Sequence, residues 1–273
     1  MKSPVNILAL MCLSLAALLT SCSMNGGSTD REPQCLQKDT VVYLSADKKG
    51  PSCKLSLTYT YLLPESEADS VTSVINSTII KEGFGAKYAS CSPEEFVSRF
   101  ADGLLEDYLE DVEDLYKADV KRGAKDYPSW LDYEYDFKTS MKSGADDVWS
   151  YTVTAYSYTG GAHGNTFHTC LNVNAKTGQL ITLDDLFRKG CEEEICDLIR
   201  EALTDGAYND ASEASTHEEL ERDVDLSSLF IPNNFILEKD CVTFVYNTYD
   251  IASYTAGSFW PSVPLSKLKD YMK

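Results

Sequence analysis

A glycine-rich stretch between two alternating segments places the strongest constraint on how this chain folds. Residues 148–156 and 166–173 alternate polar with apolar side chains, as half-buried strands do. Between them, residues 158–165 read YTGGAHGN. Glycines this dense predict a backbone that adopts positive φ angles or admits a close contact with another segment. We therefore expect two antiparallel strands joined by an elaborate turn.

This loop raises the question of a binding site. A phosphate-binding glycine loop leads into a helix N-terminus, whereas a strand follows here. A metal site needs several ligands, and the nearby partner for His163 is His168 alone. The sequence therefore favours a structural loop, with no cofactor and no metal. The loop residues to follow in the structure are Tyr158, Gly160, Gly161, His163, Gly164 and Asn165.

The loop and two later phrases resemble one known family. The later phrases are NAKTGQLITLDDLF at 174–187 and FVYNTYDIASYTAG at 244–257. They resemble the domain of unknown function that forms the C-terminal half of RsiV-type proteins, which are anti-sigma factors that sense lysozyme. The preceding part resembles the non-catalytic N-terminal domain of PdaC-type peptidoglycan deacetylases. The resemblance implies an extracytoplasmic module. Because RsiV-type proteins use a sigma-binding segment and a membrane span that we do not find here, the anti-sigma role is not carried over.

The first residues have the pattern of a bacterial lipoprotein signal. Residues 1–21 combine a basic start with an apolar run at 5–19 that is short for a membrane span. The run ends in LTSC, which predicts lipidation of Cys22 and attachment to the membrane through the lipid. Residues 22–38 are polar and predict a flexible tether. We expect a protein of the cell envelope, with the periplasmic side favoured over the cell surface.

The remaining chain predicts an α+β fold with a mainly antiparallel sheet, packed helices and two lobes. Strands fall into hairpins and helices stand apart from them, without regular βαβ alternation. We expect a PdaC-like N-terminal domain at 39–150 and an RsiV-like C-terminal domain at 151–273. Seven cysteines follow Cys22, and this odd number predicts at least one that is free or pairs between chains.

A long helix is predicted from Ser92 to about Arg122. Ser92 suits the N-cap, Pro93 the first helical position, and Glu95 a capping box. One side of this helix is acidic. Such a side is compatible with a calcium site, a docking face or a solvated surface, and the absence of an EF-hand spacing favours the solvated surface. The acidic residues are Asp102, Glu106, Asp107, Glu110, Asp111, Glu113 and Asp114.

The net charge and the absence of catalytic motifs limit the kinds of function that we expect. The formal net charge is -19, which argues against nucleic acid as a partner and suits a cationic one. No nucleophile elbow and no His-Glu-x-x-His motif is present, so we expect no catalytic residues and no enzyme activity.

We therefore predict a binding module for a cationic protein such as lysozyme, or for peptidoglycan fragments. Tyr254 and Trp260 are the candidate glycan contacts, because exposed aromatic rings stack on sugars. Acidic residues at 106–114 and 210–225 are the candidate contacts for a basic protein. The alternatives are a structural envelope lipoprotein without a small ligand and a peptidoglycan-acting enzyme.

Overall fold

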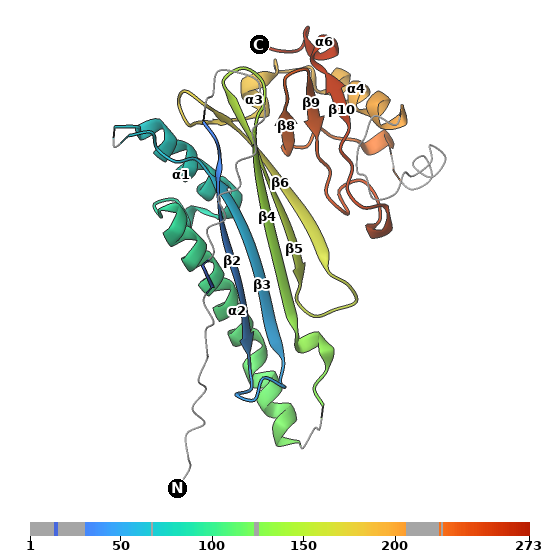
Figure 1. Ribbon diagram of the computed structural model, residues 1–273. Helices are drawn as coiled ribbons and strands as arrows, with labels where there is room; N and C mark the ends of the chain where they lie inside the picture. Colours follow the sequence, from blue (N-terminus) through green and yellow to red (C-terminus); the bar gives the residue numbers. More distant parts are fainter. Residues whose placement is uncertain (1–13, 16–30, 67, 123–125, 206–223, 225) are drawn as a thin grey trace.

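A computed structural model describes residues 14–15, 31–66, 68–122, 126–205, 224 and 226–273. A long sheet carries two helices on one face and a smaller lobe at one end (Figure 1). The long sheet contains β1 (Ser14–Leu15), β2 (Gln34–Tyr43), β3 (Ser52–Tyr61), β4 (Tyr133–Ser143), β5 (Val148–Tyr158), β6 (Asn165–Asn174) and β7 (Leu180–Ile181).

The strands of this sheet follow one another in sequence order. The pairs are antiparallel except β3 with β4, which run parallel from Cys53 beside Tyr133 to Thr58 beside Lys138. β4, β5 and β6 form the meander that the alternating segments predict, with Ser157 paired to Asn165 next to the glycine loop. The predicted α+β class with a mainly antiparallel sheet is confirmed.

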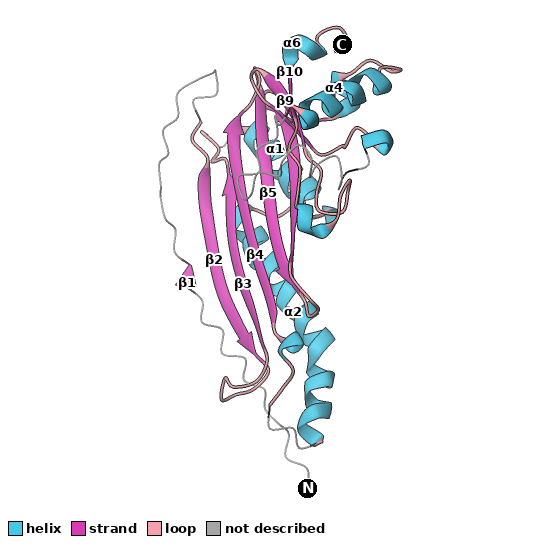
Figure 2. Cartoon of the chain, turned by 90° about the vertical axis from the view of Figure 1, so that its right-hand side faces the viewer, coloured by secondary structure: helices cyan, strands magenta, loops and turns pink. Residues whose placement is uncertain are grey.

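Helices α1 (Ser70–Phe84) and α2 (Pro93–Lys121) lie on the same face of the sheet (Figures 1 and 2). The predicted cap of α2 is confirmed, because the Ser92 side chain accepts a hydrogen bond from the Glu95 backbone N–H at 3.2 Å. The α1 helix ends before Gly85, whose φ of 114° is costly for any other residue. Buried residues from the helices and strands form one core, with Tyr59, Phe96 and Ile79 at its centre.

The C-terminal lobe has its own sheet and core. The sheet contains β8 (Phe235–Leu237), β9 (Cys241–Phe244) and β10 (Ser262–Pro264) in the order β10-β9-β8. The helices that accompany it among the described residues are α3 (Leu183–Leu186), α4 (Glu192–Thr204) and α6 (Leu265–Leu268). The apolar face of α4 packs into this second core through Ile195, Ile199 and Leu203. The lobe lies beside the end of the meander where β4 turns into β5 (Figure 1).

Asparagine side chains join the C-terminal lobe to β6. The Asn247 amide accepts the His168 backbone N–H at 2.6 Å and donates to the His168 carbonyl at 2.9 Å. Asn234 accepts the Cys170 N–H at 2.6 Å and also donates to the His168 carbonyl. Asn172, on β6 itself, bonds in both directions to the backbone of β8. These amides occupy main-chain groups that an edge strand otherwise leaves unpaired.

Some expectations differ from the structure. β2 begins at Gln34, so the last residues of the expected tether belong to the sheet. The Glu95 carboxylate forms an ion pair with Arg99 at 3.6 Å instead of closing a capping box.

Other expectations lie outside the described residues. Cys22, most of the expected signal segment and nearly all of the 210–225 segment belong to these.

Ser14–Leu15 pairs with Lys38 and Asp39 at the outer edge of β2. The seven cysteines that follow Cys22 are free thiols.

Candidate functional site

The glycine loop needs each of its glycines for a local reason. Gly160 and Gly161 have φ angles of 77° and 141°, which L side chains rarely adopt. A Cβ atom on Gly160 would also lie 2.5 Å from the Trp130 carbonyl oxygen. Gly164 is needed for space, because a Cβ there would lie 2.4 Å from the Tyr156 hydroxyl oxygen. Both consequences predicted from the glycine density, positive φ and close approach, are confirmed.

Aromatic rings of the two lobes meet at this loop. The His163 ring stacks on the Tyr254 ring with centroids 3.7 Å apart, and Tyr249 lies 5.9 Å from Tyr254. The Tyr254 hydroxyl donates to the Gly164 carbonyl at 2.7 Å. Tyr249 is 61% exposed and has a φ of 75°, which is unusual for a large side chain. We call His163, Tyr249 and Tyr254 the ring row.

Trp260 does not belong to the ring row. Its indole packs edge-on against the ring of His168 at 4.9 Å and donates to the Ser258 hydroxyl at 3.1 Å. The His168 ring also contacts the Thr154 hydroxyl at 3.2 Å, on the face of β5 and β6 opposite the helices. The two predicted glycan contacts therefore lie apart: Tyr254 packs against His163, whereas Trp260 packs against His168.

The remaining loop residues support the backbone. Tyr158 donates to the Gly161 carbonyl at 3.2 Å, across the turn. Asn165 starts β6 opposite Ser157, and its buried side-chain oxygen has no hydrogen-bond partner among the described residues. The Tyr158 hydrogen bond and the Ser157–Asn165 strand pairing hold the shape of the turn that carries His163.

A second surface lies on the helix-bearing face of the sheet. Glu106, Asp107, Glu110 and Asp111 are exposed on α2, next to β4. Burial is the main reason that the pKa of Tyr135 is raised to about 12, and smaller contributions include the carboxylates of Asp107 and Asp111. Carboxylates of α2 that form no ion pair among the described residues therefore lie next to an aromatic ring of β4.

The aromatic part of this surface follows the strands. Tyr133 and Tyr135 are half-buried on β4, and Tyr133 donates to Asp111 at a long 3.5 Å. Phe167 on β6 shares this face and is 50% exposed. We call Asp107, Asp111, Tyr133, Tyr135 and Phe167 the acidic-aromatic face.

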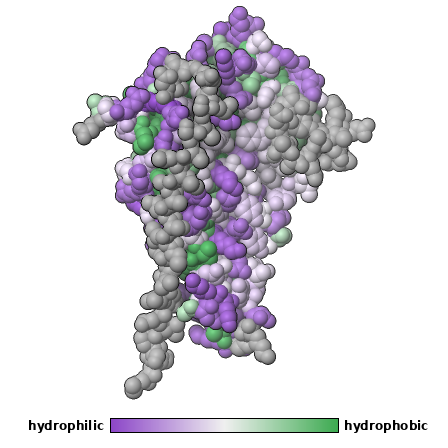
Figure 3. Space-filling view, viewed as in Figure 1, coloured by the Kyte–Doolittle hydropathy of each residue, from purple (hydrophilic) through white to green (hydrophobic). Residues whose placement is uncertain are grey.

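The sequence identified the acidic side of α2 but missed its aromatic neighbours. Tyr133 and Tyr135 alternate along β4 as core residues do, and nothing in the sequence places β6 so that Phe167 stays uncovered. Exposed hydrophobic residues are otherwise scattered, and the side shown in Figure 3 is mostly hydrophilic with small hydrophobic patches.

The described residues contain neither a candidate metal site nor a candidate membrane-spanning helix. No three His, Cys, Asp or Glu side chains are grouped as a metal ion requires in the described part of the chain. No helix within the described ranges has the length and apolar character needed to cross a membrane.

Two family models match the chain, one in each part. The model described as deacetylase PdaC matches residues 49–166, and that described as a protein of unknown function, DUF3298, matches residues 184–266. One part of the chain is thus similar to PdaC-type domains and the other to DUF3298 domains. The two matches are separated by residues 167–183, somewhat beyond the boundary expected near residue 150. The PdaC-type match ends just beyond the glycine loop, so the ring row contains residues from both domains.

Solved structures support the same arrangement. A member of the DUF3298 family from Bacteroides fragilis is 26% identical, with a TM-score of 0.78 over 91% of this chain and 96% of that chain. A DUF3298 family protein from Pseudomonas aeruginosa is 14% identical and shares the fold, with a TM-score of 0.55 over 88% and 94% of the two chains. A search of curated proteins found no match. The likeness to RsiV-type proteins stays a prediction.

Proposed function

We propose that this PdaC-DUF3298 protein is a non-catalytic lipoprotein of the cell envelope that binds a cationic protein such as lysozyme. The observation that carries the proposal is the acidic-aromatic face, where exposed carboxylates flank two half-buried tyrosines and the exposed Phe167. Aromatic residues supply contact area, and arginine or lysine side chains of a partner suit both carboxylates and ring faces.

The charges on this face are available to a partner. Glu106, Asp107 and Glu110 form no ion pair within the described part of the chain. The net charge of -19 attracts a basic protein at long range, and the local carboxylates then determine where it binds. Such attraction is screened over about 10 Å at 0.1 M salt, so the association rate is expected to fall as salt is added.

The test is a titration of the full-length chain with lysozyme at low and moderate salt. Asp107→Lys/Asp111→Lys reverses two charges within the acidic-aromatic face. Asp146→Lys/Asp270→Lys makes the same change in net charge at exposed positions elsewhere. We expect the first variant to weaken binding at least about tenfold, equivalent to ~1.4 kcal/mol, and the second to weaken it far less. Equal weakening by both variants would show that net charge alone accounts for the attraction, and it would exclude the acidic-aromatic face as the binding site.

A glycan is the second candidate ligand, and the ring row favours it. Tyr249 presents an exposed ring beside the stacked pair of His163 and Tyr254. Stacking on a sugar depends little on salt, which distinguishes this mode from the first. Tyr249→Ala is expected to abolish binding of soluble peptidoglycan fragments, while Trp130→Ala, which removes another exposed aromatic ring, retains it. Retained binding in Tyr249→Ala would exclude the ring row as the glycan site.

A further inference from the structure

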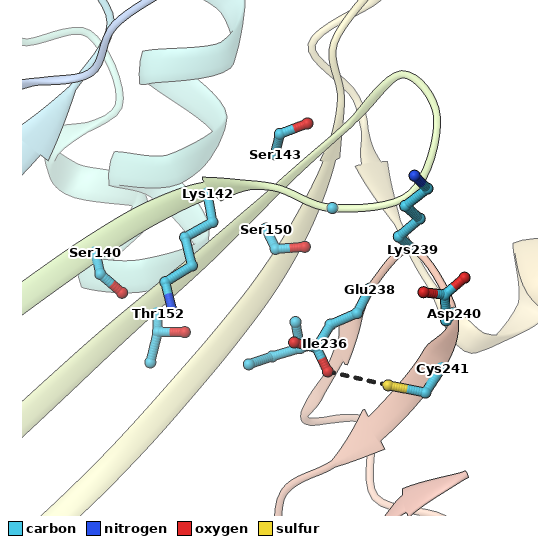
Figure 4. Close-up of a pocket in the computed structure, with 11 residues that line it drawn as sticks. Ser140, Lys142, Ser143, Ser150, Thr152, Ile236, Glu238, Lys239, Asp240 and Cys241 are labelled. Atoms are coloured by element: carbon cyan, nitrogen blue, oxygen red, sulfur yellow. Dashed lines mark hydrogen bonds between the residues drawn. The ribbon is translucent and has the colours of Figure 1, made fainter. Parts of the chain in front are cut away.

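A cavity of about 390 Å³ lies between the two domains, away from both surfaces described above. Figure 4 shows the residues that line it. One wall is the helix-free face of β4 and β5, and the other is the turn between β8 and β9. Pockets that bind small molecules span roughly 300–1,000 Å³ and often occur at domain junctions. The volume therefore suits a ligand near the lower end of that range.

The lining is polar and several of its groups are uncommitted. Lys142 extends along the cavity toward Thr152 (Figure 4) and has no carboxylate within 4.0 Å in the described ranges. The hydroxyl group of Ser140 lines the same wall and has no hydrogen-bond partner among the described residues, whereas the Ser143 side chain points away from the cavity (Figure 4). A ligand with one negative charge and several hydroxyl groups would satisfy these donors.

The opposite wall offers a fixed acceptor. Glu238 accepts hydrogen bonds from the Thr243 hydroxyl at 2.7 Å and from the Cys241 thiol at 3.1 Å. These donors hold the carboxylate in place and leave it able to accept further hydrogen bonds. The lining carries two cations, Lys142 and Lys239, and two carboxylates, Glu238 and Asp240. Lys142 forms no ion pair among the described residues, so its ammonium group is available to an anionic ligand.

The two walls are held together by short-range contacts. The Ser150 hydroxyl and the Ala145 backbone N–H both donate to the Leu237 carbonyl, at 3.1 and 3.2 Å. Gly144 passes so close that a Cβ atom would lie 2.3 Å from that carbonyl oxygen. The cavity is consequently formed before any ligand enters, which reduces the ordering needed for binding.

We propose that this cavity binds a polyhydroxylated carboxylate of monosaccharide size, a sugar acid. Lys142 pairs with the carboxylate of the ligand, the Ser140 hydroxyl donates to its oxygens, and Glu238 accepts from its hydroxyl groups. The site is independent of the acidic-aromatic face and of the ring row.

Three probes separate the parts of this proposal in calorimetric titrations of the full-length chain. Glucuronate carries both hydroxyls and charge, glucose carries the hydroxyls without the charge, and acetate carries the charge without the hydroxyls. We expect glucuronate to bind at least tenfold more tightly than either of the others. Equal binding of acetate would overturn the assignment of a sugar acid, and absence of glucuronate binding would overturn the site.

A matched pair of variants locates the binding. Lys142→Gln is expected to weaken glucuronate binding at least tenfold and to leave the thermal unfolding temperature unchanged. Lys138→Gln removes a cation from the same strand and face but outside the cavity, where it pairs with Asp136, and is expected to bind as the parent does. Equal effects of the two variants would overturn the role of Lys142.

Discussion

Replacing Asn247 tests whether asparagine side chains hold the two domains together. Its amide is 3% exposed and makes two hydrogen bonds to His168 on the free edge of β6, at 2.6 and 2.9 Å. In Asn247→Ala the His168 carbonyl keeps its bond from Asn234, whereas the His168 N–H loses the bond to Asn247. Net hydrogen bonds contribute ~0.5–1.5 kcal/mol each, and two are removed. We expect a loss of about 1–3 kcal/mol in the free energy of unfolding.

Urea unfolding measures this loss. The midpoint is expected to fall by roughly 1 M, given slopes of about 1–3 kcal/mol per molar urea. Asn233→Ala is the matched control, because Asn233 precedes Asn234 in the same segment but is exposed. Its effect is expected to stay within about 0.5 kcal/mol, as for most surface changes. A loss of that same size in Asn247→Ala would refute the reasoning.

Asn247→Asp adds a pH dependence to the same test. Burial and the facing His168 carbonyl are expected to raise the pKa of the introduced carboxyl above its unfolded value of about 3.9. The folded state then binds the proton more tightly than the unfolded state. The variant is therefore expected to approach the parent below about pH 4 and to lose stability as pH rises. A stability difference that does not change with pH would contradict the buried position of this amide.

Three further changes probe the loop and the thiol beside the cavity. Gly164→Ala places a methyl group against Tyr156 and is expected to destabilise the fold by ~1–3 kcal/mol, measured by urea unfolding. Tyr254→Phe removes the hydrogen bond to Gly164 and is expected to lower stability by ~0.5–1.5 kcal/mol, measured by thermal unfolding. Burial, with the Glu238 carboxylate, raises the pKa of Cys241 to about 11, so Glu238→Gln is expected to lower that pKa and speed alkylation of Cys241 at pH 8, followed by peptide mass mapping.

Local signals in the sequence predicted the local structure. The alternation of residues 148–156 predicted β5, and Ser92 with Pro93 predicted the start of α2, because each depends on neighbouring residues alone. The glycine density predicted the turn before His163 for the same reason. These features need no knowledge of what packs against them.

Features that depend on distant segments were not predictable in this way. The parallel pairing of β3 with β4 places Leu57 beside Phe137, and no periodic pattern specifies that partner. Asn234 and Asn247 look like ordinary loop residues in the sequence, and their role follows from the free edge of β6 that they contact. The sequence also grouped Tyr254 with Trp260, whereas the structure directs one to His163 and the other to His168.

Assembly of the long sheet depends on joining two units that the chain makes far apart. The β2-β3 hairpin and the β4-β6 meander each form from neighbouring segments, and such local contacts form early. Their junction, β3 against β4, must wait until residues 62–132 have crossed the sheet and folded into α1 and α2. Closing so long a connection is slow, because its entropy is lost before the new contacts form. Docking of these two units is therefore expected to limit the rate at which the protein refolds.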